Sequence, residues 1–323
     1  MGENTPIDAV TEVAKTGKSF LELANNMLAP VRKRMETAAE LHEIDAKIKF
    51  AEDHPEVEFV IKEDGTPGFI TSSQQELAIR AGRRLLAEAE RKQYNLEQVY
   101  VNAAKEIDDV SAEPEKSIDD DWLTRLNSIV EDVSDEEMQF VWGKILAGEY
   151  KKPGSFSMRT LDVVRNLSRA DAELFEKIAP FVIQKRGDLF IPAESEFREL
   201  LNNNNVYYSH LMKLFDSGLL RSTQAELNLF INREEQEYWH NGHQVLVILK
   251  EVDQEKRIQV SVNLLTSAGK ELFSILEATP DREFFFDFAK QIKRKNEFLR
   301  MSIHNIISIT DSMIRYSNEE TIV

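Results

Sequence analysis

The sequence predicts a mainly α-helical protein with an α+β C-terminal part. Through the first 180 residues, apolar side chains recur at spacings of three and four, which is typical of helices with one buried face. After Pro180, short strand-like runs alternate with helical ones. At 42% hydrophobic residues and 323 residues in length, the chain has enough apolar material for packed cores. We expect three regions, namely 1–110, 111–185 and 186–323.

Region 1–110 is expected to be helical, with one short hairpin. The first helix is predicted from a stripe of apolar and small residues and ends or kinks at Pro30. This stripe consists of Ile7, Val10, Ala14, Gly17, Leu21, Ala24, Leu28 and Val31. A second helix follows over 37–51. Strand-like segments at 57–61 and 69–71 flank a polar turn, which predicts the hairpin.

A third helix is predicted from Ser73 to Ile107, and a strongly acidic segment follows it. Residues 106–137 hold 2 cations and 13 anions, so this segment carries −11 of the net charge of −17. Pro114, among small polar residues, indicates a linker at 111–117. The total charge excludes a uniformly basic surface for nucleic acid, but the acidity belongs to one segment.

The region 111–185 is expected to form a bundle of four short helices. Asp119 to Asp121 favour the start of the first helix, since anions stabilise a helix N-terminus. Ser134 with Glu137 predicts a capping box for the second helix, and Gly148 is expected to end that helix. The buried face of the second helix is predicted to be Met138, Val141, Trp142, Ile145 and Leu146.

The third and fourth helices of this bundle are also predicted from their caps. Ser155 or Ser157 can cap the third helix, after a turn at 151–154. Ser168, with an acid three residues later at Asp171, predicts a capping box for the fourth helix. Four short helices in succession indicate a compact bundle.

The region 186–323 has the pattern of an α+β domain. A short strand at 189–192 precedes helices at 194–201 and 206–217, and Gly218 is expected to end the second of them. Strands are predicted at 227–231, 245–249 and 258–265, and the loop at 234–242 is expected to be a hairpin loop or wing. Further helices are predicted from Leu265 and from Thr279-Pro280. Two helices, then Gly-Leu-Leu, strands and a final helix resemble a winged-helix domain.

Familiar catalytic motifs are absent from the sequence. It contains no cysteine, no glycine-rich phosphate loop, no Gly-x-Ser-x-Gly elbow and no His-Glu-x-x-His pair. The close histidines His240 and His243 lie in a polar segment, where a solvated hairpin tip explains them better than a metal site. We therefore expect no catalytic residue, no metal and no cofactor.

A resemblance to a known family rests on the central segment. Gln139-x-x-Trp142-Gly143-Lys144-Ile145-Leu146-Ala147-Gly148-Glu149, followed by Pro153-Gly154-Ser155-Phe156-Ser157-x-Arg159, resembles a bacterial family of unknown function, numbered 2806. Segments at 30–34 and 80–95 also resemble abortive-infection alpha proteins, which are associated with phage defence. The resemblance transfers no established chemistry.

Two groups of residues are candidates for binding. A loop at a helix start can offer amide donors to a phosphate or carboxylate, and the candidate ligand residues are Lys144, Ser155, Ser157 and Arg159. A basic patch in the last helix is the candidate nucleic-acid site, and it consists of Lys290, Lys293, Arg294 and Lys295. A solvated helix face explains that patch equally well, and the helix at 206–217 has only one cation, Lys213.

The leading hypothesis is a non-enzymatic cytoplasmic interaction protein, which acts in phage defence as a sensor or effector. A protein partner or a homo-oligomer is favoured over nucleic acid. The alternatives are a nucleic-acid-binding winged-helix regulator and a peripheral membrane-acting toxin. Apolar stretches of the roughly 18 to 20 residues that cross a bilayer are absent, and the N-terminus lacks the pattern of a secretory signal.

Overall fold

The computed structural model describes residues 49, 60–61, 67–68, 72–107, 117–193, 195–231, 236–250, 256–310 and 313–323. The chain divides into two compact units, Met1–Gly154 and Ser155–Val323. The predicted helix over 7–31 lies outside the described residues, and so does the one over 37–51 except for Lys49, which is helical.

The hairpin and the long helix predicted for the first unit are present. Strands β1 (Val60–Ile61) and β2 (Pro67–Gly68) pair antiparallel, which confirms a hairpin whose second strand lies slightly earlier than expected. Helix α4 (Ser72–Ile107) begins within one residue of its prediction. Its C-terminal part is the buried part, as seen at Leu96, Val99, Tyr100, Ala103, Ala104 and Ile107.

Helix α5 (Asp120–Val130) begins as predicted, with Asp119 as its N-cap. Helix α6 (Glu136–Lys151) corrects two predictions. Its N-cap is Asp135 rather than Ser134, because the Asp135 carboxylate accepts from the Met138 amide at 3.0 Å and suits the positive end of the helix. Gly148 does not end the helix, since the chain stays helical to Lys151.

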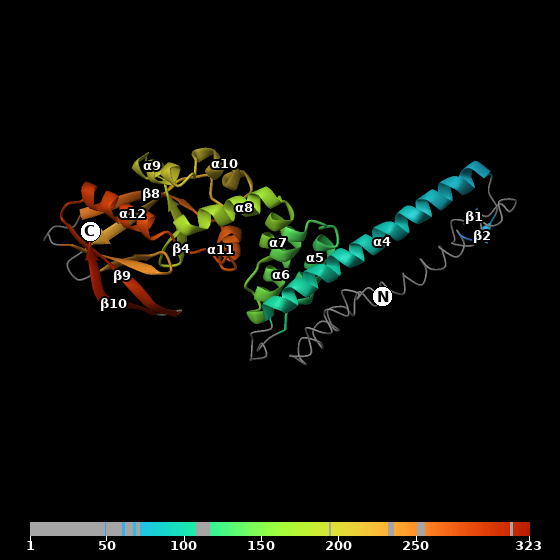
Figure 1. Cartoon of the computed structure of the whole chain (residues 1–323), viewed down its shortest axis with the longest axis horizontal. Helices are drawn as coiled ribbons and strands as arrows, with labels where there is room; N and C mark the ends of the chain where they lie inside the picture. The colour runs from blue at the N-terminus through green and yellow to red at the C-terminus, as the bar shows by residue number, and fades with distance from the viewer. Residues whose placement is uncertain are drawn as a thin grey trace. The chain divides into compact units, whose positions relative to one another are not determined.

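Helices α4 and α6 lie against each other in the first unit (Figure 1). They approach closely at Gly143, where an added Cβ would lie 2.6 Å from the Cβ of Asn102 and 3.0 Å from the amide nitrogen of Ala103. Any larger residue would force the helices apart. The predicted buried face of α6 is confirmed at Trp142 and Ile145, both fully buried.

The second unit opens with two capped helices. In α7 (Met158–Arg165) the N-cap is Ser157, which decides between the two serines considered from the sequence. In α8 (Arg169–Ile178) the predicted capping box of Ser168 and Asp171 is confirmed. A short 3-10 turn, Ala179–Phe181, leads into the sheet.

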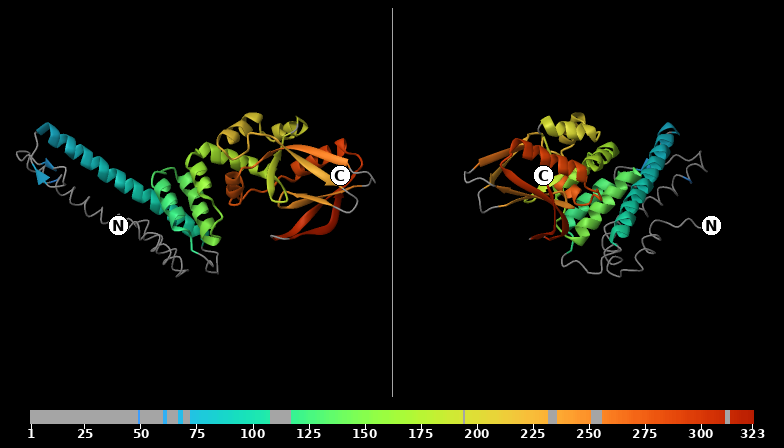
Figure 2. Two further views of the ribbon diagram at one scale, coloured as in Figure 1. Left: turned by 180° about the vertical axis from the view of Figure 1, so that it is seen from behind. Right: turned by 60° about the vertical axis from the view of Figure 1, so that its left-hand side comes forward.

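An eight-stranded sheet forms the centre of the second unit, with the order β10-β9-β7-β6-β3-β4-β8-β5. Each neighbouring pair in this order is antiparallel. Figure 2 shows the sheet from two further sides. Its strands are β3 (Ile183–Lys185), β4 (Asp188–Pro192), β5 (Ala225–Ile231), β6 (Glu237–His240), β7 (Gln244–Lys250), β8 (Lys256–Leu264), β9 (Leu299–Thr310) and β10 (Met313–Ile322).

Three parts of this sheet differ from the sequence prediction, and the first is strand β3, which was not predicted. The loop expected at 234–242 contains strand β6, which pairs with both β7 and β3 because Trp239 is a core residue and is fully buried. The long strands β9 and β10 were not predicted at all.

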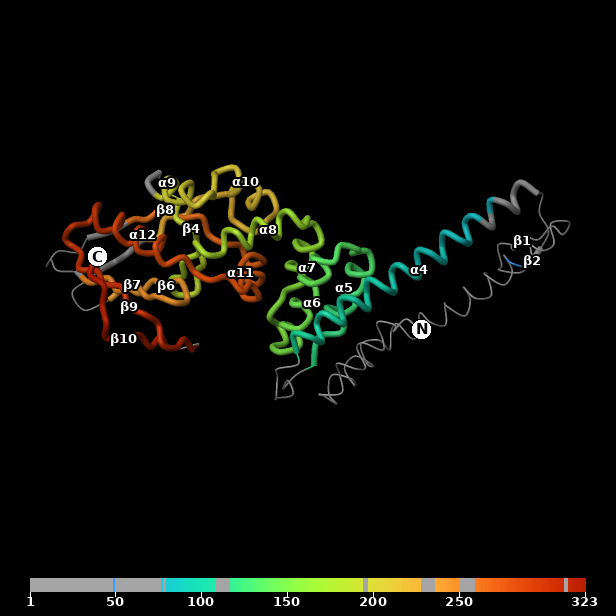
Figure 3. Tube along the Cα trace, in the orientation of Figure 1, coloured from blue at the N-terminus to red at the C-terminus, as the bar shows by residue number. Residues whose placement is uncertain are grey.

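Four helices complete the second unit, and Figure 3 traces how they alternate with the strands. They are α9 (Ser195–Asn203), α10 (Tyr208–Asp216), α11 (Ser267–Phe273) and α12 (Arg282–Lys295). The N-cap of α12 is Asp281 rather than Thr279, since its carboxylate accepts from the Phe284 amide at 2.8 Å. Helix α12 packs its Phe288 against Trp239 of the sheet, with ring centroids 5.5 Å apart.

Candidate interaction site

The candidate ligand residues of the central loop belong to different units. Lys144 lies in the first unit, where its Nζ sits 4.8 Å from the centroid of the Phe140 ring. Ser155, Ser157 and Arg159 lie in the second unit.

Carboxylates already occupy amide donors of this loop. In the first unit, the Gly154 amide donates to Glu149 at 2.6 Å. In the second unit, the Ser157 amide donates to Glu271 at 2.8 Å. An incoming phosphate or carboxylate would have to displace these acceptors and would also meet their negative charge. The glycine is explained by its backbone, since Gly154 has φ 88°, and the serine by its role as the N-cap of α7.

The basic residues of α12 are partly used within the helix itself. Lys290 forms an ion pair with Asp287 at 3.6 Å and lies 4.2 Å from the centroid of the Phe286 ring. Lys293 donates to the main-chain oxygens of Glu297 and Leu299, so it closes the C-terminal end of the helix. Arg294 and Lys295 are exposed. Local helix contacts therefore account for half of the predicted nucleic-acid patch.

The two close histidines have different surroundings. His240 is only 6% exposed in β6, and burial lowers the pKa of its imidazole. His243 is exposed in the turn that follows. A solvated hairpin tip thus describes His243 but is wrong for His240. Within the residues that the structure describes, no group of three or more metal-ligating side chains is found.

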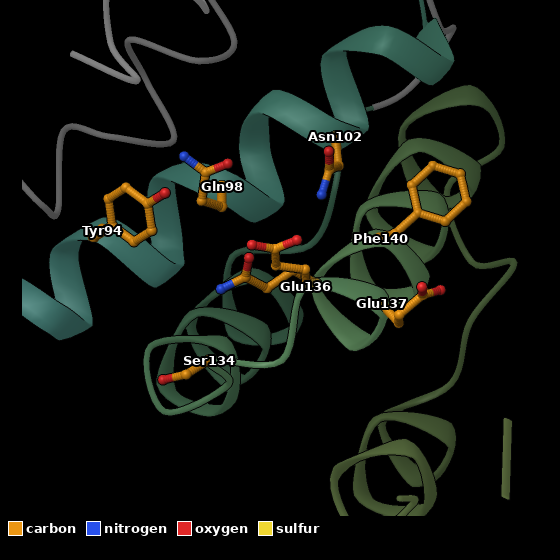
Figure 4. Close-up of a pocket in the computed structure, with 8 residues that line it drawn as sticks. Tyr94, Gln98, Asn102, Ser134, Glu136, Glu137 and Phe140 are labelled. Atoms are coloured by element: carbon orange, nitrogen blue, oxygen red, sulfur yellow. The ribbon is translucent and has the colours of Figure 1, made fainter. Parts of the chain in front are cut away.

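A polar pocket of about 380 Å³ lies between α4 and the start of α6 (Figure 4). Along α4, the picture shows Tyr94, Gln98 and Asn102 following one another. The complete lining is Tyr94, Gln98, Asn102, Ser134, Glu136, Glu137, Gln139 and Phe140. Carboxylates and amides of this kind can receive a hydrogen-bond donor or a cation.

A buried hydrogen-bond network lies under this pocket. The Asn95 amide donates to the main-chain oxygen of Glu131 and to the Ser134 hydroxyl, both at 3.0 Å. Gln139 donates to Asn95 at 3.2 Å and to the Val133 carbonyl at 2.8 Å. The network thus joins α4, the loop before α6 and α6 itself, through side chains rather than backbone ladders.

An ion-pair cluster lies at the edge of the same network. Lys92 lies 3.2 Å from a Glu131 carboxylate oxygen and 3.4 Å from Asp132. The hydrogen bond to Glu131 raises the pKa of Lys92, and the charges of both acids add to it. This cluster is partly exposed, so it contributes little to stability compared with the buried amides.

Helix α10 presents exposed aromatic and apolar side chains in the second unit. Its Leu211 and Leu214 are buried, whereas Tyr207, Tyr208 and Met212 are 47%, 49% and 40% exposed. The 206–217 pattern groups Tyr207 with Leu211, Leu214 and Phe215 on one face, but Tyr207 is the N-cap residue and is exposed. Tyr208 and Met212 are four residues apart and therefore share one side of the helix.

The charge on this surface is low. Lys213 is the only cation within α10 itself, and Asp216 follows it. Burial and the charges of Lys177 and Lys213 lower the pKa of His210, so its ring is neutral at pH 7. The Arg198 guanidinium of α9 lies 5.0 Å from the centroid of the Tyr208 ring.

Sequence reasoning missed Tyr208, Met212 and Arg198 as surface residues of interest. A signal was present, because Tyr208 and Met212 fall outside the inward spacing of Leu211 and Leu214. Arg198 could not be found this way, since only the fold brings α9 beside α10.

The structure thus combines a helical unit, held by a buried polar network, with an antiparallel-sheet unit that presents an aromatic helix face. Among the described helices, none is both long and apolar enough for a membrane crossing. The model of a family described as "Protein of unknown function (DUF2806)" matches residues 79–289, which is well over half of the chain. The protein belongs to this family. Comparisons with curated proteins and with solved structures give no significant match.

Proposed function

We propose that this protein is a non-enzymatic interaction protein, and that a winged-helix-like module in its second unit binds a protein partner through α10. The observation that carries the proposal is the exposed surface of Tyr207, Tyr208 and Met212 on a helix with one cation. Tyrosine and methionine are enriched in protein interfaces, whereas lysine and acidic residues are depleted there.

The order of elements supports a winged-helix-like module. Helix α8 precedes β4, the helices α9 and α10 follow, and β5 and β8 complete the set. In the sheet, β8 lies between β4 and β5. Along the chain, the β6–β7 hairpin comes between β5 and β8, and in the sheet it lies on the far side of β3. By this order, α10 is the helix that a nucleic-acid-binding winged helix would use for recognition.

The same helix is poorly suited to nucleic acid. Phosphate contacts supply most of the affinity for DNA, and they come mainly from lysine, arginine and amide donors. The α10 surface offers Lys213 and a neutral His210. Two further cations come from neighbouring helices, namely Lys177 of α8 and Arg198 of α9. We therefore favour a protein partner over a nucleic-acid ligand.

We further propose a cytoplasmic role in phage defence, as a sensor or effector. This part rests on the resemblance of segments 30–34 and 80–95 to abortive-infection alpha proteins. A phage challenge tests it: cells that express the protein should plate phage less efficiently than cells without it. The double variant Tyr208→Ala/Met212→Ala should lose this protection, whereas the matched surface variant Arg294→Ala should keep it.

The nature of the partner can be tested directly. A photo-reactive amino acid at position 212 should give protein adducts in infected cells, and the same residue at the exposed position Ser222 should not. Adducts whose added mass is removed by nuclease would replace the proposal with nucleic-acid binding. If the double variant still protects the cells, phage defence does not require the α10 surface.

A further inference from the structure

The outer edge of the sheet is open at β10. This strand is last in the sheet order, and in the described part of the chain no strand pairs with its outer side. Near its two ends, Met313 and Ile322 are 59% and 72% exposed. An exposed edge with apolar side chains is a template for another strand, and soluble proteins usually shield such edges.

The register of β10 on β9 shows which of its residues share a face. Tyr316 lies opposite Ile306, and its ring is 5.0 Å from that of His304, two residues along the same face of β9. Glu320 and Ile322 lie opposite His304 and Ser302, so they are on this face too.

Ile314 joins this face as well. Between Arg315 and Tyr316 the register shift places the extra residue in β9, so β10 itself alternates regularly from Met313 to Tyr316. Ile314 is two residues from Tyr316 and therefore points to the same side. The face thus carries an aliphatic residue near each end of the strand, with Tyr316 and Glu320 between them.

We propose that β10 pairs antiparallel with β10 of a second copy of this chain, around a twofold axis at Asn318. Such an axis is perpendicular to the sheet and keeps each residue on its own face, so only residues of one face can lie opposite each other. With Asn318 at the axis, Ile314 lies opposite Ile322 of the partner subunit. Tyr316 lies opposite Glu320 of the partner subunit.

The charges of β10 favour this antiparallel arrangement. Arg315 is in the first half of the strand, and Glu319 and Glu320 are in the second half. Antiparallel pairing brings each Arg315 opposite Thr321 of the partner subunit and diagonal to Glu319 of the partner subunit, within reach of a long side chain. In a parallel alignment, like charges would face each other.

The irregular centre of the strand is compatible with this pairing. Between Tyr316 and Glu320 three residues of β10 face one of β9, so the strand forms a bulge there. The His304 Nδ1–H donates to the Ser317 carbonyl at 2.9 Å and ties this bulge to β9. The ladder between copies therefore consists of two short arms on either side of the axis. The surface is separate from α10, so the inference does not depend on the proposed function.

Charge reversal in the full chain tests the pairing. We expect a concentration-dependent dimer in sedimentation velocity, and Arg315→Glu or Glu319→Arg should each weaken it roughly tenfold, because each changes two diagonal contacts. The double variant Arg315→Glu/Glu319→Arg should restore the dimer to near its original affinity. A monomer at all accessible concentrations would overturn the proposal. So would a dimer whose affinity is unchanged in both single variants.

The absence of cysteine allows a second, positional test. Asn318→Cys places a thiol at the axis, so mild oxidation of the full chain should give a disulfide-linked dimer. The matched control Glu226→Cys lies on β5, the opposite edge of the sheet, and should form no disulfide-linked dimer under the same oxidation. Cross-linking through Glu226→Cys but not Asn318→Cys would also overturn the proposal.

Discussion

The main helix contact inside each unit is of a different kind. In the second unit, α12 covers the sheet with a cluster of aromatic rings around Phe288, which contacts Trp239, Phe190 and Phe197. In the first unit, α4 and α6 meet at Gly143 and through the amide network of Asn95 and Gln139. The contact of α12 with the sheet is thus formed by buried rings, whereas the contact of α4 with α6 adds a close approach and satisfied polar groups.

This difference explains why the residues of the family motif lie where α6 meets α4. The residues that carry it, Gln139, Trp142 and Gly143, lie on α6 where that helix meets α4, and Glu149 holds the turn after α6. A close crossing tolerates few substitutions, because one added methyl group or one lost amide has no room or partner. An aromatic cluster accepts any residue of suitable size. Packing therefore explains these residues of the motif.

Trp239→Ala should have the largest effect. It removes a fully buried indole between Phe190 and Phe288, so we expect a loss of about 3–5 kcal/mol in the stability of the second unit. Hydrogen exchange of the full chain should show faster exchange in the sheet strands and little change in α4. Trp239→Phe is the control, since it keeps a ring and also removes a buried Nε1–H that has no acceptor among the described residues. Equal losses for both variants would contradict the role of buried area.

Gly143→Ala tests the close crossing of the first unit. The new methyl group would lie 2.6 Å from the Asn102 Cβ, so the helices must separate, at a cost of roughly 1–3 kcal/mol. Because alanine favours a helix by about 1 kcal/mol over glycine, any net loss must come from the contact. Hydrogen exchange in α4 and α6 should rise while the sheet is unchanged. Combining it with Asn102→Gly should cost less than the sum of the two single variants.

Gln139→Met tests the hydrogen-bond network in the same contact of α4 with α6. The volume is nearly kept, but Asn95 loses a donor to its side-chain oxygen and the Val133 carbonyl loses its amide partner. We expect a loss of about 1–3 kcal/mol, measured by denaturant unfolding with a probe in the first unit. Gln98→Met on α4 is the control, because Gln98 is only half-buried. A neutral Gln139→Met would show that the network adds no stability.

The sequence predicted the helical parts much better than the sheet. Capping residues such as Ser168 and Asp171 act locally, so their pattern is visible in the chain. Strand β6 was missed because its neighbours β3 and β7 decide its burial, and its sequence of Glu, Tyr, Trp and His reads as polar. The same holds for the candidate site, since neither the α9–α10 contact nor the amide network spanning Asn95 and Gln139 can be inferred from spacing.

His240, in that missed strand, gives the smallest predicted effect. Burial lowers the pKa of its imidazole below the value near 6.5 of the unfolded chain, so the unfolded state binds the proton more readily. Above about pH 6.5 the His240 imidazole is mainly neutral in both states, so its burial costs no stability. As the pH falls through that value towards the folded pKa, the unfolded state takes up a proton that the folded state does not, and the free energy of unfolding decreases. His240→Gln should reduce the loss of stability between about pH 7.5 and 5.5, measured as the shift in urea midpoint.

His243→Gln is the matched control for this last prediction, because His243 lies three residues away and is exposed. It should leave the pH dependence close to that of the unchanged protein. If both variants changed the pH dependence equally, the effect would belong to the charge of the turn and not to burial in β6. Such a result would show that the burial of the His240 imidazole in β6 does not change its protonation.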